Sequence, residues 1–406
     1  MRKQRVMWLA SFGTAAAVGI SLAVQTAISM LAGCIPLLAP MIADTRGWRA
    51  DLIALFAPMV YLVGFGINFA VPRLLARYGG MGLSLICVAA CVSGLVCVLF
   101  DNLAICALST VGIGVAVGMM NPASAQMLAP RTSPRTASTI MAVKQTGVPL
   151  GGMLAGALAP ALAVRFGWQE ALGVFAIGSA ILVGALLPTV RWLNGDMNGS
   201  GSRSPGRVEM RRLLCIPGMW VIVVAGAVFS AALVCLRTFL AVYLVKELGF
   251  SLAVAGLAFS ASQAAGMVGQ LGWAAISDRL LAPHATMGLI GFFIASAAVL
   301  IAAFSARWAA GAVCAVTVVY GLGAAGFVPL VLGEVARRAD PGEVGAVTSA
   351  ANLFLLGGVV VGPMLFGAVA SVQGYSAAFA ALSACVLVVS LIACMRARRI
   401  TDAIGA

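Results

Sequence analysis

The chain has 406 residues, of which 62% are hydrophobic and 9% are charged, and its mean hydropathy is +1.07. Such a composition leaves too little polar surface to cover a water-soluble domain, so it excludes a soluble globular protein and predicts one embedded in a lipid bilayer. The formal net charge of +13 would suit a nucleic-acid partner. The cations are spread over short loops rather than gathered in one patch, however, so we expect no nucleic acid.

Apolar stretches of about 20 residues, enough for a helix to cross a hydrocarbon core of about 30 Å, recur along the whole sequence. The first follows a basic N-terminal segment, as in a signal peptide, but it is too long for a cleaved signal and we expect it to be retained. We predict an all-α membrane protein with twelve transmembrane helices. They lie near residues 10–42, 50–72, 82–100, 103–127, 137–163, 169–190, 216–244, 252–276, 286–304, 308–333, 344–370 and 376–395.

Lysine and arginine residues are divided unequally between alternate loops. Eighteen of the 25 fall in loops on the side of the two termini. The loops on the other side hold five, which are Arg46, Arg49, Arg165, Lys246 and Arg307. The positive-inside rule then predicts that both termini are cytoplasmic, in the cytoplasmic (inner) membrane, and that the number of spans is even.

Cysteine and histidine give no sign of a metal or disulfide framework. The ten cysteines lie almost entirely in apolar stretches without CxxC spacing, which favours a packing role. The single histidine, His284, is expected in a loop. The residues Gly321, Gly323 and Gly326 match a dinucleotide-binding pattern, but they lie inside an apolar span without the strand that such a site needs. We expect neither a metal nor a cofactor.

One polar, glycine- and serine-rich stretch divides the sequence into two parts. We predict an N-terminal bundle of six helices over residues 1–190, a flexible cytoplasmic linker over 191–214, and a C-terminal bundle of six helices over 215–406. Nothing in the sequence indicates an obligate oligomer, and we expect a monomer.

The two parts repeat one another. Gly47-Trp48 returns as Gly249-Phe250 after 202 positions, and Gly167-Trp168 returns as Gly374-Tyr375 after 207 positions. Parallel repeats of this kind are common in transporters that bind their substrate between the repeats.

These features resemble the major facilitator superfamily over essentially the whole chain. The cytoplasmic signature of that family, G-x-x-x-D-R-x-G-R-K, is matched in the second half by Gly272 and Asp278-Arg279, while the first half has Ala76-Arg77. The resemblance implies gating by helix-end charges in an alternating-access cycle. The gate candidates are Asp278, Arg279, Glu334, Arg337, Arg338 and Arg77. Ordinary interfacial charges are the alternative interpretation of these residues.

The predicted fifth helix contains the run Gly147-x-Pro149-x-Gly151-Gly152. It resembles the glycine-proline signature of antiporters in this superfamily, with the proline displaced by one residue. Small residues here, and at Gly156, allow close helix packing, and a proline permits bending. Gly362 and Pro363 are further candidates for such packing or a hinge.

Two cations, Lys144 and Arg237, lie well inside apolar spans, one in each half. A charge at the centre of a membrane helix costs about 2.5 to 3.5 kcal/mol on insertion scales, so it usually serves a function. No acidic residue lies deep in a span to pair with either, and we expect both to bind an anionic substrate. Snorkelling to an interface or bonding to helix carbonyls is the alternative.

Amide side chains complete the predicted substrate site. They are Gln25, Asn121, Gln145, Gln263 and Asn352, of which Gln145 and Asn352 are repeat equivalents. Each could instead bridge two helices through a hydrogen bond.

We therefore predict a secondary active or facilitative transporter that moves a small organic or inorganic anion through the bilayer. A coupling ion is left open, since a proton would have to use the substrate or a peripheral acid such as Asp51. A drug or metabolite efflux antiporter is the first alternative, and a non-transporting receptor or channel is the second. An enzyme is not expected, because the sequence lacks a catalytic constellation.

Overall fold

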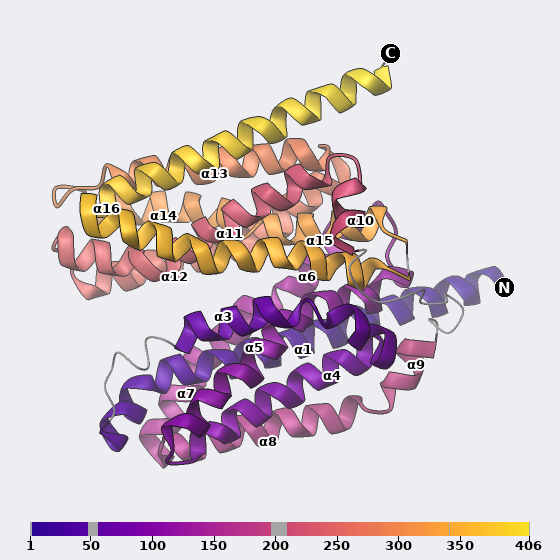
Figure 1. Cartoon of the computed structure of the whole chain (residues 1–406), viewed down its shortest axis with the longest axis horizontal. Coiled ribbons are helices and arrows are strands. Elements are labelled where there is room, and N and C mark those ends of the chain that lie inside the picture. The colour runs from indigo at the N-terminus through magenta and orange to yellow at the C-terminus, as the bar shows by residue number, and fades with distance from the viewer. Residues whose placement is uncertain (1, 48–55, 196–208, 341, 406) are drawn as a thin grey trace. The chain divides into compact units, whose positions relative to one another are not determined.

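The computed structural model describes residues 2–47, 56–195, 209–340 and 342–405, and these residues form helices and no strands. Figure 1 labels the helices along the chain. Their bounds are α1 Arg2–Arg46, α3 Phe56–Ile67, α4 Val71–Leu99, α5 Leu103–Leu128, α6 Ala137–Gln145, α7 Gly147–Phe166, α8 Trp168–Leu186, α9 Thr189–Gly195, α10 Glu209–Cys215, α11 Met219–Val242, α12 Leu252–Arg279, α13 Pro283–Ala302, α14 Ala310–Ala324, α15 Phe327–Arg338 and α16 Val344–Gly405. Short helical turns follow α5 at Ala129–Arg131 and α11 at Tyr243–Glu247.

The described helices agree with the predicted membrane spans. Nine stretches among the described residues are long and apolar enough to cross a bilayer. One of them, Val344–Ala397, covers the last two predicted spans, while α3 and α12 coincide with the second and eighth. The fold is therefore the predicted multi-pass membrane protein of twelve helical spans.

Three spans that we predicted as continuous are interrupted, each at a proline. Pro72, Pro149 and Pro329 lie in the first turn of α4, α7 and α15. A proline has no N–H for the carbonyl four residues earlier, and its ring clashes with that carbonyl, so the preceding helix ends there. The chain accordingly breaks after Ile67, after Gln145 and after Ala324.

The internal repeat has a structural counterpart in two pairs of glycines. Gly47 and Gly249 both have positive φ, 63° and 71°, and so do Gly167 and Gly374, at 102° and 84°. Residues with a Cβ rarely adopt this backbone conformation, so glycine lets one helix end and the next begin in a new direction. The two halves therefore share the positive-φ glycines at which one helix ends and the chain changes direction.

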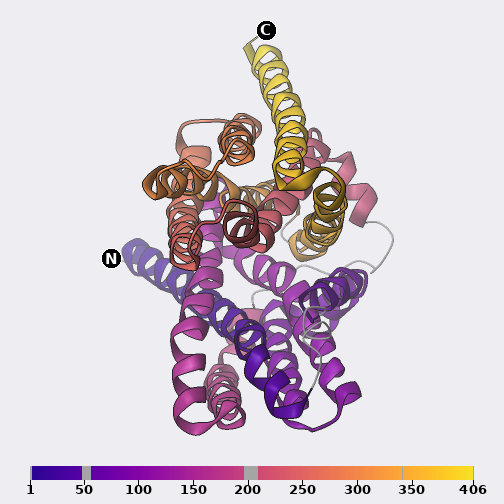
Figure 2. The ribbon, with the colours of Figure 1, turned by 90° about the vertical axis from the view of Figure 1, so that its left-hand side faces the viewer.

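The described chain forms two compact units. Unit 1 comprises Met1–Pro134, Val143–Met210 and Val335–Leu353, and unit 2 comprises Arg135–Ala142, Arg211–Glu334 and Phe354–Ala406. Figure 2 shows the same helices after a turn of 90° about the vertical axis, with several of them seen close to end-on. The predicted domain bounds stay a prediction, and the predicted linker over 191–214 contains parts of α9 and α10, while residues 196–208 lie outside the described residues.

Glycines allow close packing of α1 against α7 in unit 1. A Cβ at Gly151 would meet the Thr26 carbonyl oxygen, and it would lie 2.6 Å from Ser29 Cβ and 2.7 Å from Met30 N. At Gly147 a Cβ would lie 2.9 Å from Gln25 Cβ. Since helices in a bilayer associate through close van der Waals contact, these two glycines hold α7 against α1.

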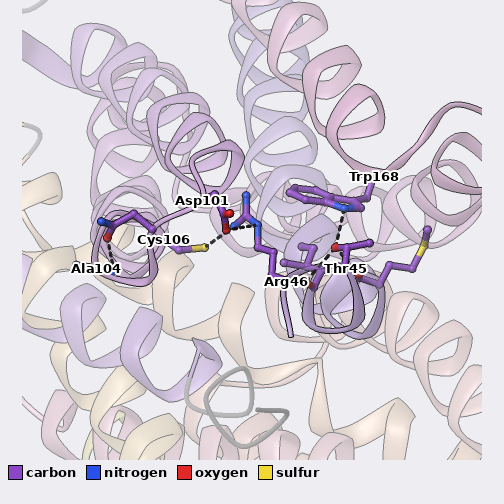
Figure 3. A network of polar contacts seen from close by, with 9 residues as sticks. Thr45, Arg46, Asp101, Ala104, Cys106 and Trp168 are labelled. Carbon is purple, nitrogen blue, oxygen red and sulfur yellow. Dashed lines mark hydrogen bonds and ion pairs between the residues drawn. The ribbon is translucent and has the colours of Figure 1, made fainter. Parts of the chain in front are cut away.

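At the other end of α1, Arg46 joins three helices of unit 1 (Figure 3). Its guanidinium lies 3.5 Å from the Asp101 carboxylate and 4.7 Å from the centre of the Trp168 ring. The Trp168 indole N–H donates to Thr45 Oγ1 at 3.1 Å. This network connects the end of α1 with the starts of α5 and α8.

His284 was predicted to lie in a loop, and that prediction is wrong. It lies in the first turn of α13, is buried, and has Nε2 at 3.0 Å from the Gly218 carbonyl oxygen. Pro283, which is favoured at a helix start, places the residue inside the helix rather than before it.

Candidate substrate-binding site

Lys144 is the centre of a polar network in unit 1. It lies at the end of α6, one residue before the interruption that Pro149 causes, and its side chain is completely buried. The ammonium donates to Asn121 Oδ1 at 2.7 Å and to Gln145 Oε1 at 2.9 Å. An ammonium has three N–H donors, so one donor remains for another acceptor.

Asn121 connects this network to Asn352 of α16. Its Nδ2 donates to Asn352 Oδ1 at 3.3 Å. The Asn352 Nδ2 in turn donates to Asn68 Oδ1 at 3.3 Å and to the Gly118 carbonyl at 3.0 Å. Because Pro122 lacks the N–H that Gly118 would otherwise bond in α5, the Asn352 amide satisfies a carbonyl that the helix leaves open.

The charge of Lys144 is not neutralised by a neighbouring acid. Among the residues that the structure describes, no carboxylate forms an ion pair with it. Amide oxygens solvate an ammonium but carry no net charge, so the desolvation of Lys144 is only partly offset. A second buried polar group packs against the start of α7, where a Cβ at Gly147 would lie 2.9 Å from Gln25 Cβ. The Gln25 side chain is 7% exposed, and its Oε1 has no hydrogen-bond partner.

Arg237 occupies a less buried position in unit 2. It lies in α11, and its Nε donates to Gln263 Oε1 of α12 at 3.3 Å. An intramembrane cation thus donates to an amide in each unit, to Asn121 and Gln145 in unit 1 and to Gln263 in unit 2.

Asp278 contacts the start of α6. Its carboxylate accepts hydrogen bonds from Ser138 N at 3.3 Å, Thr139 N at 2.8 Å and Thr139 Oγ1 at 2.8 Å. The predicted gate role of Asp278 with Arg279, which is exposed, stays a prediction. A carboxylate at the N-terminus of α6 is stabilised by the helix dipole.

Replacing Asp278 with alanine is expected to lower the free energy of unfolding by about 0.5 to 2 kcal/mol, since the amides that begin α6 lose their acceptor. Thermal melting of the purified protein measures this. Asp340→Ala removes an exposed acid that follows α15 and is the matched control. Equal melting temperatures for the two variants would contradict the capping role.

The other gate candidates are distributed as follows. Arg77 is exposed and lies 5.3 Å from the centre of the Tyr78 ring. Glu334 is buried in α15, Arg337 is partly buried and Arg338 is exposed in its last turn. Their gating role stays a prediction.

The predicted packing glycines fall into two groups. Gly147 and Gly151 contact α1, and a Cβ at Gly362 of α16 would lie 2.7 Å from Ala231 Cα of α11. For Gly152 and Gly156 the packing prediction is wrong within the described residues, because a Cβ at either position would meet nothing within 4 Å. Gly152 follows Gly151 by one residue, which turns it by about 100° away from α1. The hinge role of Pro149 and Pro363 stays a prediction.

Sequence reasoning missed Asn68, Ser138 and Thr139. Asn68 is a single amide in an apolar span, four residues before Pro72, and both facts were available from the sequence. Its partner Asn352 is 284 positions away, so no local pattern could have paired them. Ser138 and Thr139 donate through backbone N–H groups, which every residue except proline possesses, and Thr139 adds its hydroxyl. A single hydroxyl gives too little sequence signal to identify the contact.

The apolar spans, with polar groups buried inside them, define a multi-pass membrane protein. A sequence profile of the Major Facilitator Superfamily matches residues 20–355 and 239–403, and the chain belongs to this family. No curated protein matches the chain in sequence.

Solved structures with the same fold span nearly the whole chain. The human organic anion transporter MFSD10 (TETRAN) has a TM-score of 0.70 and 16% identity over 94% of this chain and 99% of that one. A bacterial homologue of the iron transporter ferroportin has a TM-score of 0.70 and 15% identity, covering 95% and 99%. The E. coli fucose:proton symporter FucP has a TM-score of 0.69 and 14% identity, covering 94% and 99%. At these identities the similarity concerns the fold alone.

Proposed function

We propose that this transporter carries a small organic or inorganic anion by alternating access, and that Lys144 supplies its main charge contact. The observation that carries the proposal is the state of Lys144: the side chain is wholly buried and its hydrogen-bond acceptors are the neutral amides of Asn121 and Gln145. An anion would use the remaining N–H donor and neutralise the charge. Because the ammonium is buried, an anion reaches it only when neighbouring helices move, as alternating access requires.

Arg237 is the second cation that we assign to the substrate. A guanidinium can bind a carboxylate or phosphate through two parallel hydrogen bonds. Its contact with Gln263 uses Nε, and Gln25 and Asn352 are the further amides that we propose as substrate ligands. The unpartnered Gln25 Oε1 offers an acceptor to a hydroxyl or amide group of the substrate.

We propose that both termini are cytoplasmic and that the protein is a monomer in the inner membrane. The distribution of lysine and arginine between alternate loops supports the orientation. A coupling ion is not assigned, and Asp51, a peripheral acid that could carry a proton, lies outside the described residues.

Efflux of cationic drugs is less favoured by the same site. A buried ammonium repels a second cation, and the described residues place no carboxylate beside it. A channel or receptor differs from a carrier in its kinetics, since only a carrier shows saturable counterflow.

Thermal stabilisation of the purified protein tests the proposed substrate class. A panel of carboxylates, inorganic anions and lipophilic cations is compared on the wild type, on Arg237→Gln and on the exposed control Arg191→Gln. A ligand at 100 times its Kd stabilises the folded state by about 2.7 kcal/mol. We expect one class of anion to raise the melting temperature of the wild type and the control, and to act less on Arg237→Gln.

Counterflow of the stabilising anion in proteoliposomes then shows whether it is transported. Stabilisation by lipophilic cations alone, with no effect of Arg237→Gln, would favour the efflux antiporter and overturn the anion proposal.

A further inference from the structure

The two acceptors of Lys144 are amides, and each has an acidic counterpart of the same shape. Asn121 Oδ1 lies 2.7 Å from the ammonium and Gln145 Oε1 lies 2.9 Å from it. Aspartate and glutamate have the same shapes as these two residues and would place an ionised oxygen at the same distances. Either acid would form an ion pair with Lys144 inside unit 1.

We propose that Asn121 and Gln145 determine the charge selectivity of the site. These neutral ligands position the Lys144 ammonium without neutralising its positive charge, so an anionic substrate can neutralise it. This inference rests on the proposed function and deepens it. The amides supply directional acceptors, which orient the ammonium and offset part of its desolvation. They supply no countercharge, so the substrate provides it.

The hydrogen bonds around Asn121 support its role as an amide. Its Oδ1 accepts from Lys144 while its Nδ2 donates to Asn352 Oδ1 at 3.3 Å. Aspartate has no donor, so it would turn its second oxygen toward the Asn352 oxygen and force the Asn352 amide to rotate. The present network therefore requires a residue that accepts on one side and donates on the other, which Asn provides and Asp does not.

Two charge-introducing substitutions test the inference. Asn121→Asp and Gln145→Glu each place a built-in carboxylate beside Lys144, where it acts as a competitor that is always bound. We expect each variant to weaken anion binding at least tenfold, measured by the concentration of anion that stabilises the purified full chain against thermal melting. Two positions are used because Asn121→Asp also disturbs Asn352, whereas Gln145→Glu does not remove a hydrogen bond described for Asn352.

Asn102→Asp, at the N-cap of the helix that contains Asn121, is the matched control. Asn102 lies immediately before α5, is exposed, and caps that helix by accepting from Ala104 N at 2.9 Å and Ile105 N at 3.2 Å. Aspartate caps a helix as well as asparagine. The control therefore adds the same charge to the protein while leaving the Lys144 network unchanged, and its anion affinity should equal that of the wild type.

The outcomes separate this inference from the proposed function. If the wild type binds an anion, Lys144→Gln loses it, and the folded fractions of Asn121→Asp and Gln145→Glu keep it within twofold, then the assignment of charge selectivity to the amides is overturned while the anion site stands. If no anion stabilises the wild type, the proposed function itself fails and this inference with it. Loss of anion binding in Gln145→Glu, with retention in Asn102→Asp, supports the inference, whereas loss in Asn121→Asp alone would assign the effect to the disturbed Asn352 and overturn it.

Discussion

Lys144→Gln is expected to abolish measurable anion transport and to weaken anion binding by about 10- to 100-fold. The range follows from the loss of a hydrogen bond to a charged group, about 1.5 to 3 kcal/mol, with each 1.4 kcal/mol equal to a factor of ten. At the same time the melting temperature of the anion-free protein should stay the same or rise. Replacing a buried charge removes a desolvation cost that neutral amides offset only in part.

This combination of lost function and preserved stability separates a binding role from a structural one. Counterflow in proteoliposomes measures transport, and thermal melting with and without the anion measures binding and stability. Arg191→Gln removes an exposed cation from α9 and controls for the change in net charge. A large fall in melting temperature together with unchanged anion affinity would show that Lys144 supports the fold instead.

The second large effect is expected at Gly151. Valine there places its Cβ against the Thr26 carbonyl and the Met30 amide nitrogen of α1, and backbone atoms cannot move aside as a flexible side chain can. We expect Gly151→Val to destabilise the protein by about 3 kcal/mol, the upper end of what overpacking usually costs. The yield of monodisperse protein in size-exclusion chromatography and its melting temperature measure the effect.

Gly152→Val is the matched control for Gly151→Val, because it makes the same substitution at the adjacent residue of the same helix. A Cβ at Gly152 meets nothing within 4 Å and the residue is exposed. Its stability should therefore change by no more than about 0.5 kcal/mol. Similar losses in both variants would mean that valine harms α7 itself, and the packing of α7 against α1 would not be the cause.

The buried polar network of unit 1 lies at two of the helix interruptions and beside Pro122 of α5. Asn68 follows the end of α3, Lys144 and Gln145 end α6, and Asn352 bonds the carbonyl that Pro122 leaves open in α5. Backbone groups freed by proline need polar partners in a membrane interior, where no water is available. For Asn352 the proline gives the reason, since its amide donates to the Gly118 carbonyl that Pro122 leaves open.

The sequence by itself determined the number and positions of the spans, the family, and the identity of the intramembrane cations. These follow from local properties: the length of an apolar stretch, the hydrophobic content around a charge, and the spacing of the repeats. The positions of the helix breaks were also available, since Pro72, Pro149 and Pro329 are visible in the sequence, although we predicted the spans as continuous.

The tertiary structure decided which groups meet. It paired Asn352 with Asn68 and Asn121, and it placed the Asp278 carboxylate at the start of α6. It also separated Gly151, which packs on α1, from Gly152, which does not. The reason is that a hydrogen bond or a close contact depends on positions in space to within a few tenths of an ångström, and packing sets those positions between segments far apart in the chain.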